Sequence, residues 1–554
     1  MTASNTDTPV LLQPENQNKK YEALFVEIDS GQIKLPMFQR EFVWDKEQTA
    51  KLIDSILKGF PIGTFIFWKT REHLRSYKDV GNHKLPDTPN GDSVQYILDG
   101  QQRITSLYAI RKGIRITKDG KEIDYRDIFI DLDYSEVDEQ IVVTDKDDGK
   151  QYISVHSVLT RQITSMFNEY PHDSLEKIES YKNKLTGYDF STITIKDYPI
   201  DIACEVFSRI NTGGKSLSVF EVMVAKTYDE TRGFDLAEKF EELRDGVDDA
   251  RPSLAAAKFE TIPETIAMQC VAVITLRAVR GKDILRIPRP TFIDNWEPMK
   301  AALFMAIDFV RTQLRVPVSQ LLPYPAVLIP IMYYFYSTNN RRATYEEARR
   351  LEQFYYWVGL NERYSSSTDS RLAEDLHKMD CITRGEAPTY SPNELTIRPS
   401  DIAATWFSTS NSYCKAILSL FASHAPQSFD TNGVVILDNS NLKIASSRNY
   451  HHFFPRRHLE DVGRLQEPNL IANITMIDGY SNKHLIGKKA PSVYVEKFAE
   501  QNSQIDDTLK THLIINKEDF GVMSDDYETF IKLRSIAIAN ELNAKIMSPT
   551  LDRA

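Results

Sequence analysis

The spacing of apolar residues along the chain changes near Gly233, from a mixture of strand and helix patterns to a helix pattern alone. This change limits the folds that the chain can adopt. Upstream of it, short runs of β-branched and aromatic residues alternate with helical patterns. From about Gly233 to Phe421, Ala, Leu, Tyr and Arg recur at helical spacing and strand patterns are hard to find. Short apolar runs return after Asn432. We therefore expect an α+β multidomain protein with a mixed α/β N-terminal domain, a helical middle and a smaller C-terminal domain.

The same pattern sets the domain boundaries. We predict a disordered polar tail at residues 1–20, the N-terminal domain at 21–232, a helical linker or scaffold at 233–431 and the C-terminal domain at 432–554. The first residues lack the basic-then-apolar layout of a secretory signal, and no apolar run approaches the roughly 20 residues that span a bilayer. We expect a cytoplasmic protein with no membrane partner.

Cysteine content and charge exclude some classes of protein. The four cysteines, Cys204, Cys270, Cys381 and Cys414, stand far apart and form no CxxC pair, which argues against a disulfide framework and a zinc knuckle. The net charge of −11 argues against a protein coated in basic residues. It leaves room for a local basic groove, which is what an enzyme that must release DNA needs.

Strands and helices alternate in the N-terminal domain. The segment Asp45–Gly59 predicts a helix, with its first residue as N-cap and Gln48 at the capping-box position. Thr64–Trp68 and Val94–Leu98 predict strands, and the second runs directly into Asp99 and Gly100 before a helix that starts near Gln101.

A third strand–loop–helix unit is predicted further on. It consists of Cys204–Ile210, the loop Asn211–Gly214 and a helix from about Ser218. In the C-terminal domain, Val434–Leu437 and Leu442–Ala445 have the pattern of two short strands joined by a turn. An amphipathic helix that includes Phe530, Leu533, Ile536 and Ile538 is expected near the C-terminus.

Adjacent histidines mark the C-terminal domain. The segment Tyr450–His458 reads YHHFFPRRH, and neighbouring residues of a strand point to opposite sides, so one histidine can meet a metal while the other faces a substrate. Asn473 and Asn482 follow. Phosphodiester hydrolysis needs a base, a cation and stabilisation of the leaving oxygen, and these residue types can supply the parts.

The charge around these histidines suits a phosphate backbone. Between residues 441 and 460 there are four basic residues and one acidic residue, Glu460. The basic residues are Lys443, Arg448, Arg456 and Arg457, and Lys483, Lys488 and Lys489 follow downstream.

The segment resembles the His-Asn-His, or ββα-metal, nucleases. His452 followed by Pro455 matches the His-x-x-Pro variant of that family. The resemblance implies that His452 is the general base, that Asn473 orients it through a backbone contact, and that His451 and Asn482 bind a divalent metal, Mg²⁺ or Mn²⁺. His451 stands where the family often has an aspartate, which admits nickel as well, and His484 is a rival ligand.

Three N-terminal segments carry a second set of polar residues: LPMFQREFVW (35–44), ILDGQQRITSL (97–107) and FSRINTGGKSLS (207–218). Backbone N–H groups at the start of the helix after Gly100 favour an anion, and Arg103 lies one turn in, where it can reach a phosphate. Asp99 can hold a cation or cap the helix. The sequence Gly214-Lys215-Ser216 is not a P-loop, because the required upstream glycine is replaced by Arg209.

Together these segments resemble the ParB-related N-terminal domain of GmrSD-type modification-dependent restriction endonucleases. The resemblance implies binding and hydrolysis of a nucleotide, GTP or ATP, with Asp99 and Arg103 in the reaction. RYSSSTDSRLAEDL (363–376) resembles the helical linker of the same architecture. The residues that the motif match assigns to nucleotide binding are Gln39, Arg40, Gly100, Gln101 and Gln102, joined by Arg209 and Asn211 of the third segment.

The family implies a phage-defence endonuclease that cuts or nicks DNA at the C-terminal site, under control of an N-terminal domain that binds nucleotide and senses modified cytosine or phosphorothioate DNA. Two alternatives stay open: an NTP-hydrolysing, DNA-binding switch with a non-catalytic C-terminal domain, and an RNA-cutting toxin. The apolar C-terminal helix is a candidate homodimer contact.

Overall fold

We describe the chain from a computed structural model, in which it divides into two compact units with the boundary between Asp235 and Leu236. The helical middle and the C-terminal histidine segment therefore share one unit. The residues that the structure describes are 13–35, 44–72, 74, 76, 79–80, 83–89, 92–118, 121–135, 140–210, 218–247, 252–391, 394, 396–443, 450–463 and 468–546.

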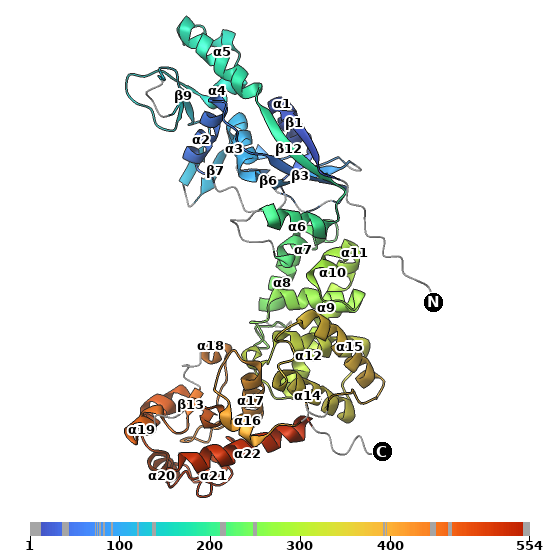
Figure 1. The fold of residues 1–554 in the computed structure, drawn as a ribbon, viewed down its shortest axis with the longest axis vertical. Coiled ribbons are helices and arrows are strands. Elements are labelled where there is room, and N and C mark those ends of the chain that lie inside the picture. The colour runs from blue at the N-terminus through green and yellow to red at the C-terminus, as the bar shows by residue number, and fades with distance from the viewer. Residues whose placement is uncertain are drawn as a thin grey trace. The chain divides into compact units, whose positions relative to one another are not determined.

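A five-stranded mixed sheet forms the centre of the N-terminal unit (Figure 1). β12 runs parallel to β3 and β2 parallel to β6, whereas the β1–β12 and β3–β6 pairs are antiparallel. In spatial order the strands are β1 (Glu15–Lys20), β12 (Asp189–Lys196), β3 (Phe65–Thr70), β6 (Val94–Asp99) and β2 (Ile33–Lys34).

Helices α1 (Tyr21–Asp29), α2 (Lys46–Leu57) and α3 (Gln101–Lys112) contribute apolar side chains to the same buried cluster as this sheet. The capping box predicted for α2 is confirmed: the Asp45 carboxylate accepts from the backbone N–H of Gln48 at 2.7 Å, and the Gln48 side chain returns to the N–H of Asp45. The strands expected near β3 and β6 and the helix after Gly100 are confirmed as well.

Two N-terminal predictions are wrong. The polar tail was expected to extend to residue 20, but β1 pairs with β12 along its whole length, because the backbone of a polar segment can add a strand at a sheet edge without apolar side chains. Cys204–Ile210, expected as a strand, lies in helix α6 (Ile200–Ile210). Its apolar residues recur at helical spacing and face one side, which a short window does not separate from a strand.

Smaller elements complete this unit. They are β4 (Asp79–Val80), β5 (His83–Lys84), β7 (Arg115–Lys118), β8 (Lys121–Asp124), β9 (Phe129–Asp131), β10 (Val142–Val143), β11 (Tyr152–Ser154), α4 (Val155–Thr160), α5 (His172–Thr186) and α7 (Val219–Thr227).

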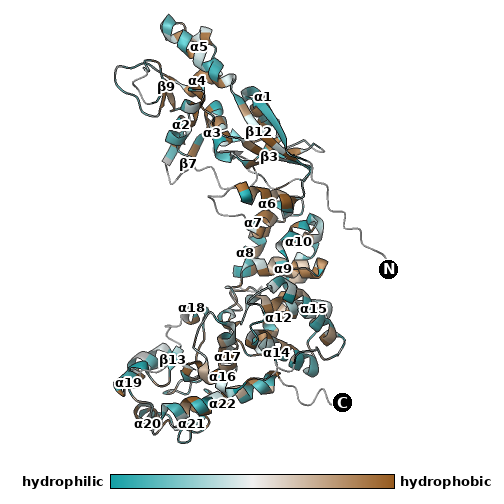
Figure 2. Ribbon diagram, in the orientation of Figure 1, coloured by the Kyte–Doolittle hydropathy of each residue, from teal (hydrophilic) through white to brown (hydrophobic). Residues whose placement is uncertain are grey.

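The C-terminal unit is mainly helical, as the spacing predicts. Its centre is α14 (Tyr345–Leu360), in which every residue from Leu351 to Leu360 is buried. Figure 2 shows hydrophobic and hydrophilic residues alternating along the C-terminal helix α22 (Tyr527–Ile546), which contacts α14 and α16. The other long helices are α8 (Leu236–Asp245), α9 (Glu264–Leu276), α12 (Trp296–Thr312), α13 (Leu328–Ser337), α15 (Thr368–Thr383), α17 (Ser412–Ser423) and α20 (Pro491–Gln501).

Short elements connect them: α10 (Gly281–Arg286), α11 (Arg289–Asp294), α16 (Pro399–Ala404), α18 (Asn439–Leu442), α19 (Arg456–Asp461) and α21 (Ile505–Lys510). The strands predicted at Val434–Leu437 and Leu442–Ala445 do not form in the described part of these segments. Val434 makes an isolated bridge to Gln427, and the Asp438 carboxylate caps α18 by accepting from the N–H of Ser440. Along the stretches that the structure describes, the helices are too short or too polar to span a bilayer.

Candidate active site

A two-stranded hairpin carries the adjacent histidines. Strand β13 (Tyr450–His452) pairs antiparallel with β14 (Ile474–Met476), so that His451 lies opposite Thr475 and His452 opposite Ile474. A short π-helical turn, η6 (Ser481–Ile486), follows β14. Strand alternation separates the two histidines: His451 is 2% exposed, whereas His452 is half-buried.

Asn473 ties the chain that follows β13 to the chain that precedes β14. Its side chain is fully buried, with Oδ1 accepting from the N–H of Phe454 at 2.9 Å and Nδ2 donating to the carbonyls of Phe454 at 3.0 Å and Pro468 at 2.9 Å. The backbone carbonyl of Asn473 accepts from the N–H of Phe453. The orientation of the segment after His452 is therefore fixed by one amide side chain.

A second asparagine, Asn469, contacts the imidazole of His452 directly. Its Nδ2 donates to the Phe407 carbonyl at 3.3 Å, which leaves Oδ1 to face Nε2 of His452 at 3.1 Å. Because a side-chain carbonyl only accepts, Nε2 carries the proton and Nδ1 holds the free lone pair. Burial lowers the pKa of His452, against the opposing effect of the Asn469 hydrogen bond, and the charge of Arg456 lowers it further. The His452 imidazole is therefore neutral near pH 7.

His451 faces the interior of the unit. Its Nδ1 lies 3.0 Å from the Thr475 hydroxyl, and the rings of Phe429, Phe453 and Tyr494 surround it at centroid distances of 6.1 to 6.4 Å. Among the residues that the structure describes, Nε2 has no hydrogen-bond partner. Burial holds its pKa well below the usual range, and the nearby charges of other basic groups, including Arg534, add to this effect.

These surroundings do not fit His451 to the expected role of metal ligand. Nε2 is a single ring nitrogen around which aromatic rings rather than carboxylates pack, and the buried Arg534 guanidinium, whose charge acts on this ring, repels a divalent cation. No group of three or more His, Cys, Asp or Glu residues that could hold a metal occurs within the described ranges.

Asn482, the second expected ligand, lies in η6 next to the start of β13. Its Nδ2 donates to the Tyr450 carbonyl at 3.3 Å, so the turn after β14 is held against the first strand. The rival His484 is exposed, and its ring lies beside that of Tyr480 at a centroid distance of 5.1 Å, tilted by 37°. Asn473 and Asn482 thus hold backbone groups on either side of His452, those of Phe454 and Tyr450, while the side chain of His451 points into the core.

Exposed cations lie on α19, which follows β13 in the connection to β14. Arg456 and Arg457 have side chains 74% and 70% exposed, and each has an acidic partner one turn along the helix, Glu460 at 3.0 Å and Asp461 at 3.9 Å. Exposed pairs of this kind are weak, so a phosphate can replace the carboxylates. Lys443 and Lys488 are also exposed, and Arg448 lies outside the described residues.

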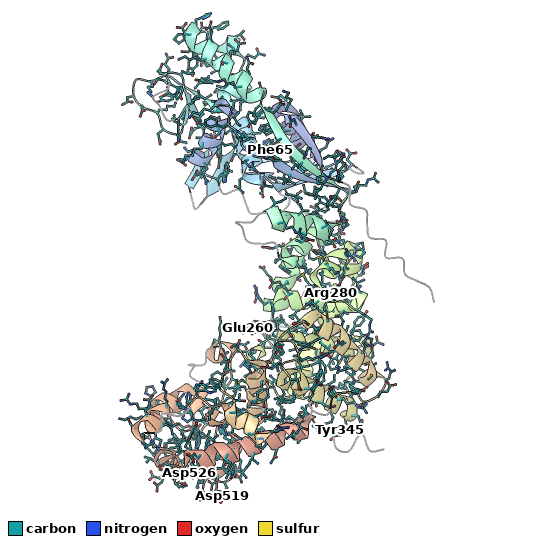
Figure 3. All side chains as sticks on the ribbon, viewed as in Figure 1. Phe65, Glu260, Arg280, Tyr345, Asp519 and Asp526 are labelled. Carbon is teal, nitrogen blue, oxygen red and sulfur yellow. The ribbon has the colours of Figure 1, made fainter. Side chains whose placement is uncertain are left out.

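In the N-terminal unit, Arg103 is held by protein groups. Its Nη1 donates to the Ile62 carbonyl, and Nη2 donates to the Thr64 carbonyl and to the Asp99 carboxylate, both at 3.1 Å. The guanidinium also lies 5.0 Å from the centroid of the Phe65 ring, which Figure 3 labels on the sheet. Asp99 and Arg103 form a clamp between the start of α3 and the loop before β3.

Two glycines make room for this clamp. Gly63 and Gly100 have φ of +85° and +88°, and a Cβ would lie 2.4 Å from Arg103 Nη1 at Gly63 and 2.3 Å from the Phe65 ring at Gly100. Both positions therefore need glycine for conformation and for space.

The remaining predicted nucleotide-binding residues divide into two groups. Gln101 is buried, Gln102 is half-buried, and both have partners within the chain. Arg209 is exposed at the end of α6 and pairs with Glu205 at 2.5 Å. Gln39, Arg40 and Asn211 lie outside the described residues.

Two residues of this region, Asn469 and the buried Arg534, are not predicted from the sequence. Asn469 precedes Asn473 by four residues. In the sequence it is marked only as a further asparagine shortly before the strand that follows the histidine segment. Arg534 is fully buried on α22, where it donates to the carbonyls of His512 at 3.1 Å and Ala472 at 2.7 Å. Its neighbours in the sequence have the pattern of an ordinary amphipathic helix, so nothing there marks it.

Comparison with known proteins agrees with the N-terminal motif. Residues 21–228 match the GmrSD restriction endonuclease, N-terminal domain, family. The matched range lies within the N-terminal unit, which is therefore similar to the N-terminal domain of that family. Over nearly its whole length the chain is also similar to the uncharacterized protein MJ0686 of Methanocaldococcus jannaschii, with 22% identity across 92% of this chain and 96% of the relative.

Proposed function

We propose that this protein is a DNA endonuclease of the restriction type, in which the hairpin of the C-terminal unit cuts a phosphodiester bond and the GmrSD-type domain controls it. The observation that carries the proposal is the hydrogen-bonded arrangement of His452. Asn469 holds its Nε2–H, Asn473 fixes the following backbone, and Asn482 holds η6 against the same strand.

The chemistry follows from the free ring nitrogen. Nδ1 of neutral His452 accepts a proton from a water molecule as the oxygen of that water bonds to phosphorus. The bond between phosphorus and the leaving sugar oxygen breaks, the leaving oxygen takes a proton from solvent, and the Asn469 carbonyl stabilises the imidazolium that forms. Arg456 and Arg457 bind the neighbouring phosphates of the strand. A divalent cation, Mg²⁺ or Mn²⁺, belongs to the proposal through the His-Asn-His resemblance, and the described residues do not supply its full ligand set.

Control by nucleotide and by DNA modification is proposed from the resemblance of the three N-terminal segments to GmrSD-type proteins. We propose that GTP or ATP binds near the start of α3 and that its hydrolysis licenses cutting of DNA that carries modified cytosine or phosphorothioate linkages. Because Arg103 is held by protein acceptors, its proposed effect on the nucleotide is to position the α3 N-terminus, whose backbone N–H groups attract the phosphates.

A cleavage assay tests the proposal. Unmodified, cytosine-modified and phosphorothioate DNA would each be incubated with Mg²⁺ or Mn²⁺, with and without GTP or ATP. We expect His452→Ala to reduce cutting by about 10²–10⁴-fold. His458→Ala, which removes a half-buried histidine from α19, is the matched control and should leave the rate within a few fold of the unsubstituted protein.

Equal cutting by His452→Ala and the unsubstituted protein would refute the assignment. If no DNA is cut but NTP is hydrolysed, the NTP-dependent switch becomes the better description, and RNA is the next substrate to test.

A further inference from the structure

A pocket of about 400 Å³ opens in the C-terminal unit near the hairpin, on the segment that contacts Asn469. Trp406, Ser408, Asn411, Glu362 and Tyr413 are among the residues that line it. Trp406 is 57% exposed, although a side chain of this size is usually covered in a folded chain. No role in the hairpin accounts for this exposure.

Backbone pairing connects this pocket to His452. Trp406 forms an antiparallel bridge with Leu470, and Phe407 exchanges hydrogen bonds with Asn469 through its N–H at 2.8 Å and its carbonyl at 3.3 Å. Asn469 in turn contacts the imidazole of His452. The Trp406 backbone is also held from the other side, because the Cys414 thiol donates to its carbonyl at 3.1 Å. The exposed indole is therefore attached to a backbone segment that hydrogen bonds hold in place, one residue before Phe407, the partner of Asn469.

The composition of the lining favours an uncharged, flat ligand that carries hydrogen-bond donors. The residues that line the pocket include one carboxylate, Glu362, and neither lysine nor arginine. The Glu362 carboxylate accepts from Asn411 Nδ2 at 2.7 Å through Oε1, so the pocket keeps acceptor capacity rather than a cation for a phosphate. An indole face, a carboxylate acceptor and a volume in the range of small-molecule sites suit a nucleobase with an amino group.

We propose that this pocket, which we call the Trp406 pocket, binds an unpaired nucleobase of the DNA strand whose phosphate lies at His452. Trp406 stacks on the base, and Glu362 accepts a hydrogen bond from its exocyclic amino group, which favours adenine, cytosine or guanine over thymine. This inference rests on the proposed nuclease function, since it names how the same site holds its substrate. Extrusion of a base would bend the strand and present the phosphate to His452.

Binding can be measured without cleavage. The full-length His452→Ala protein would be titrated into two fluorescein-labelled single strands of equal length, one of oligo-dC and one with abasic residues throughout its centre, and anisotropy would report affinity. We expect oligo-dC to bind about tenfold more tightly than the abasic strand. Adding Trp406→Ala should remove this difference, and Trp406→Phe should restore part of it.

Two further variants separate base binding from backbone binding. Arg456→Gln should weaken both strands equally, because it removes a phosphate contact. Glu362→Gln should reduce the preference for oligo-dC over oligo-dT and leave the abasic strand unchanged. Since Trp406 is largely exposed, its loss should not alter the unfolding temperature, which checks that each variant folds.

The outcomes are decisive for the pocket alone. Equal affinities for oligo-dC and the abasic strand, the same base preference with and without Trp406, or no binding of either strand would each overturn the proposal. Cleavage by the unsubstituted protein and its loss in His452→Ala test the nuclease function separately, so the pocket can fail while the function stands. Conversely, base-dependent binding through Trp406 together with cleavage that does not need His452 would retain the pocket and refute the catalytic assignment.

Discussion

The start of α3 and the β13–β14 hairpin each carry a motif side chain close to the end of a strand, but they use it in opposite ways. In the N-terminal unit both terminal nitrogens of Arg103 donate to protein oxygens. In the C-terminal unit Nε2–H of His452 donates to Asn469, and this hydrogen bond leaves the lone pair of the imidazole on Nδ1. A sequence motif therefore indicates where a site lies, but the hydrogen bonds that each side-chain atom makes determine which atoms can react.

Among the substitutions that test this comparison, Arg103→Ala should have the largest effect, a loss of stability of the N-terminal unit. It removes the donors to the Ile62 and Thr64 carbonyls and the contact with the Phe65 ring, so we expect the N-terminal unit to lose roughly 3 kcal/mol of unfolding free energy. Denaturant unfolding and hydrogen exchange of the α3 amides would measure this loss of unfolding free energy. Arg115→Ala, on the exposed strand β7, is the matched control and should cost less than about 1 kcal/mol.

This experiment can also break the comparison. If Arg103→Ala keeps its stability but loses nucleotide binding, then the side chain is a ligand contact, and the two motif residues are used alike.

Asn473→Ala should be the next largest effect. It leaves the Phe454 N–H and two carbonyls without partners in a buried place, and we expect the C-terminal unit to lose roughly 2 kcal/mol. Asn439→Ala is the matched control, because that buried side chain also makes hydrogen bonds to backbone groups, those of Lys258 and Gln320. Both variants should be destabilised, but only Asn473→Ala should slow cleavage by the folded protein. Slowing by both would mean that stability alone controls the rate.

Asn469→Ala sharpens the assignment of the ring nitrogens. Without the carbonyl that holds Nε2–H, the His452 tautomer is no longer fixed, and we expect cleavage to fall about tenfold. Asn469→Asp should keep the tautomer and raise the pKa of His452, moving the acid limb of the pH–rate profile to higher pH. A profile that both variants leave unchanged would place Asn469 in a purely structural role.

The smallest effect should be that of Arg456→Gln on pH dependence. Burial and the Arg456 charge lower the pKa of His452, so cleavage should persist below pH 6.5 and fall only as the pH drops through the lowered pKa. Removing the positive charge raises this pKa, and the midpoint should move slightly upward. Rates measured at high salt should reduce the shift, because Arg456 is exposed. A downward shift would contradict the assignment of His452 as the base.

The sequence allowed part of this structure to be predicted, for identifiable reasons. The α2 capping box and the end of β6 just before Gly100 both depend on local spacing and on residues with strong positional preferences. Strand β1 could not be predicted, because its polar residues owe their conformation to pairing with β12, more than 150 residues away along the chain.

The candidate site divides in the same way. The resemblance to His-Asn-His nucleases implies a backbone contact for Asn473, and in the structure its side chain hydrogen-bonds to the Phe454 backbone. That His451 faces Phe429 and Tyr494 could not be known, because the strand pattern places the two histidines on opposite sides without saying which side is the interior. Asn469 and Trp406 are brought to His452 by pairing between distant segments.

The exposure of Trp406 has a spectroscopic consequence. Of the five tryptophans of the chain, Trp68, Trp296 and Trp357 are buried and Trp44 is half-buried. Trp406 should therefore emit at longer wavelength than these four and be quenched first by iodide or acrylamide. The protein thus carries an optical reporter on the segment that pairs with residues 469 and 470, where Asn469 contacts the candidate catalytic histidine, and changes there can be followed in solution without attaching a dye.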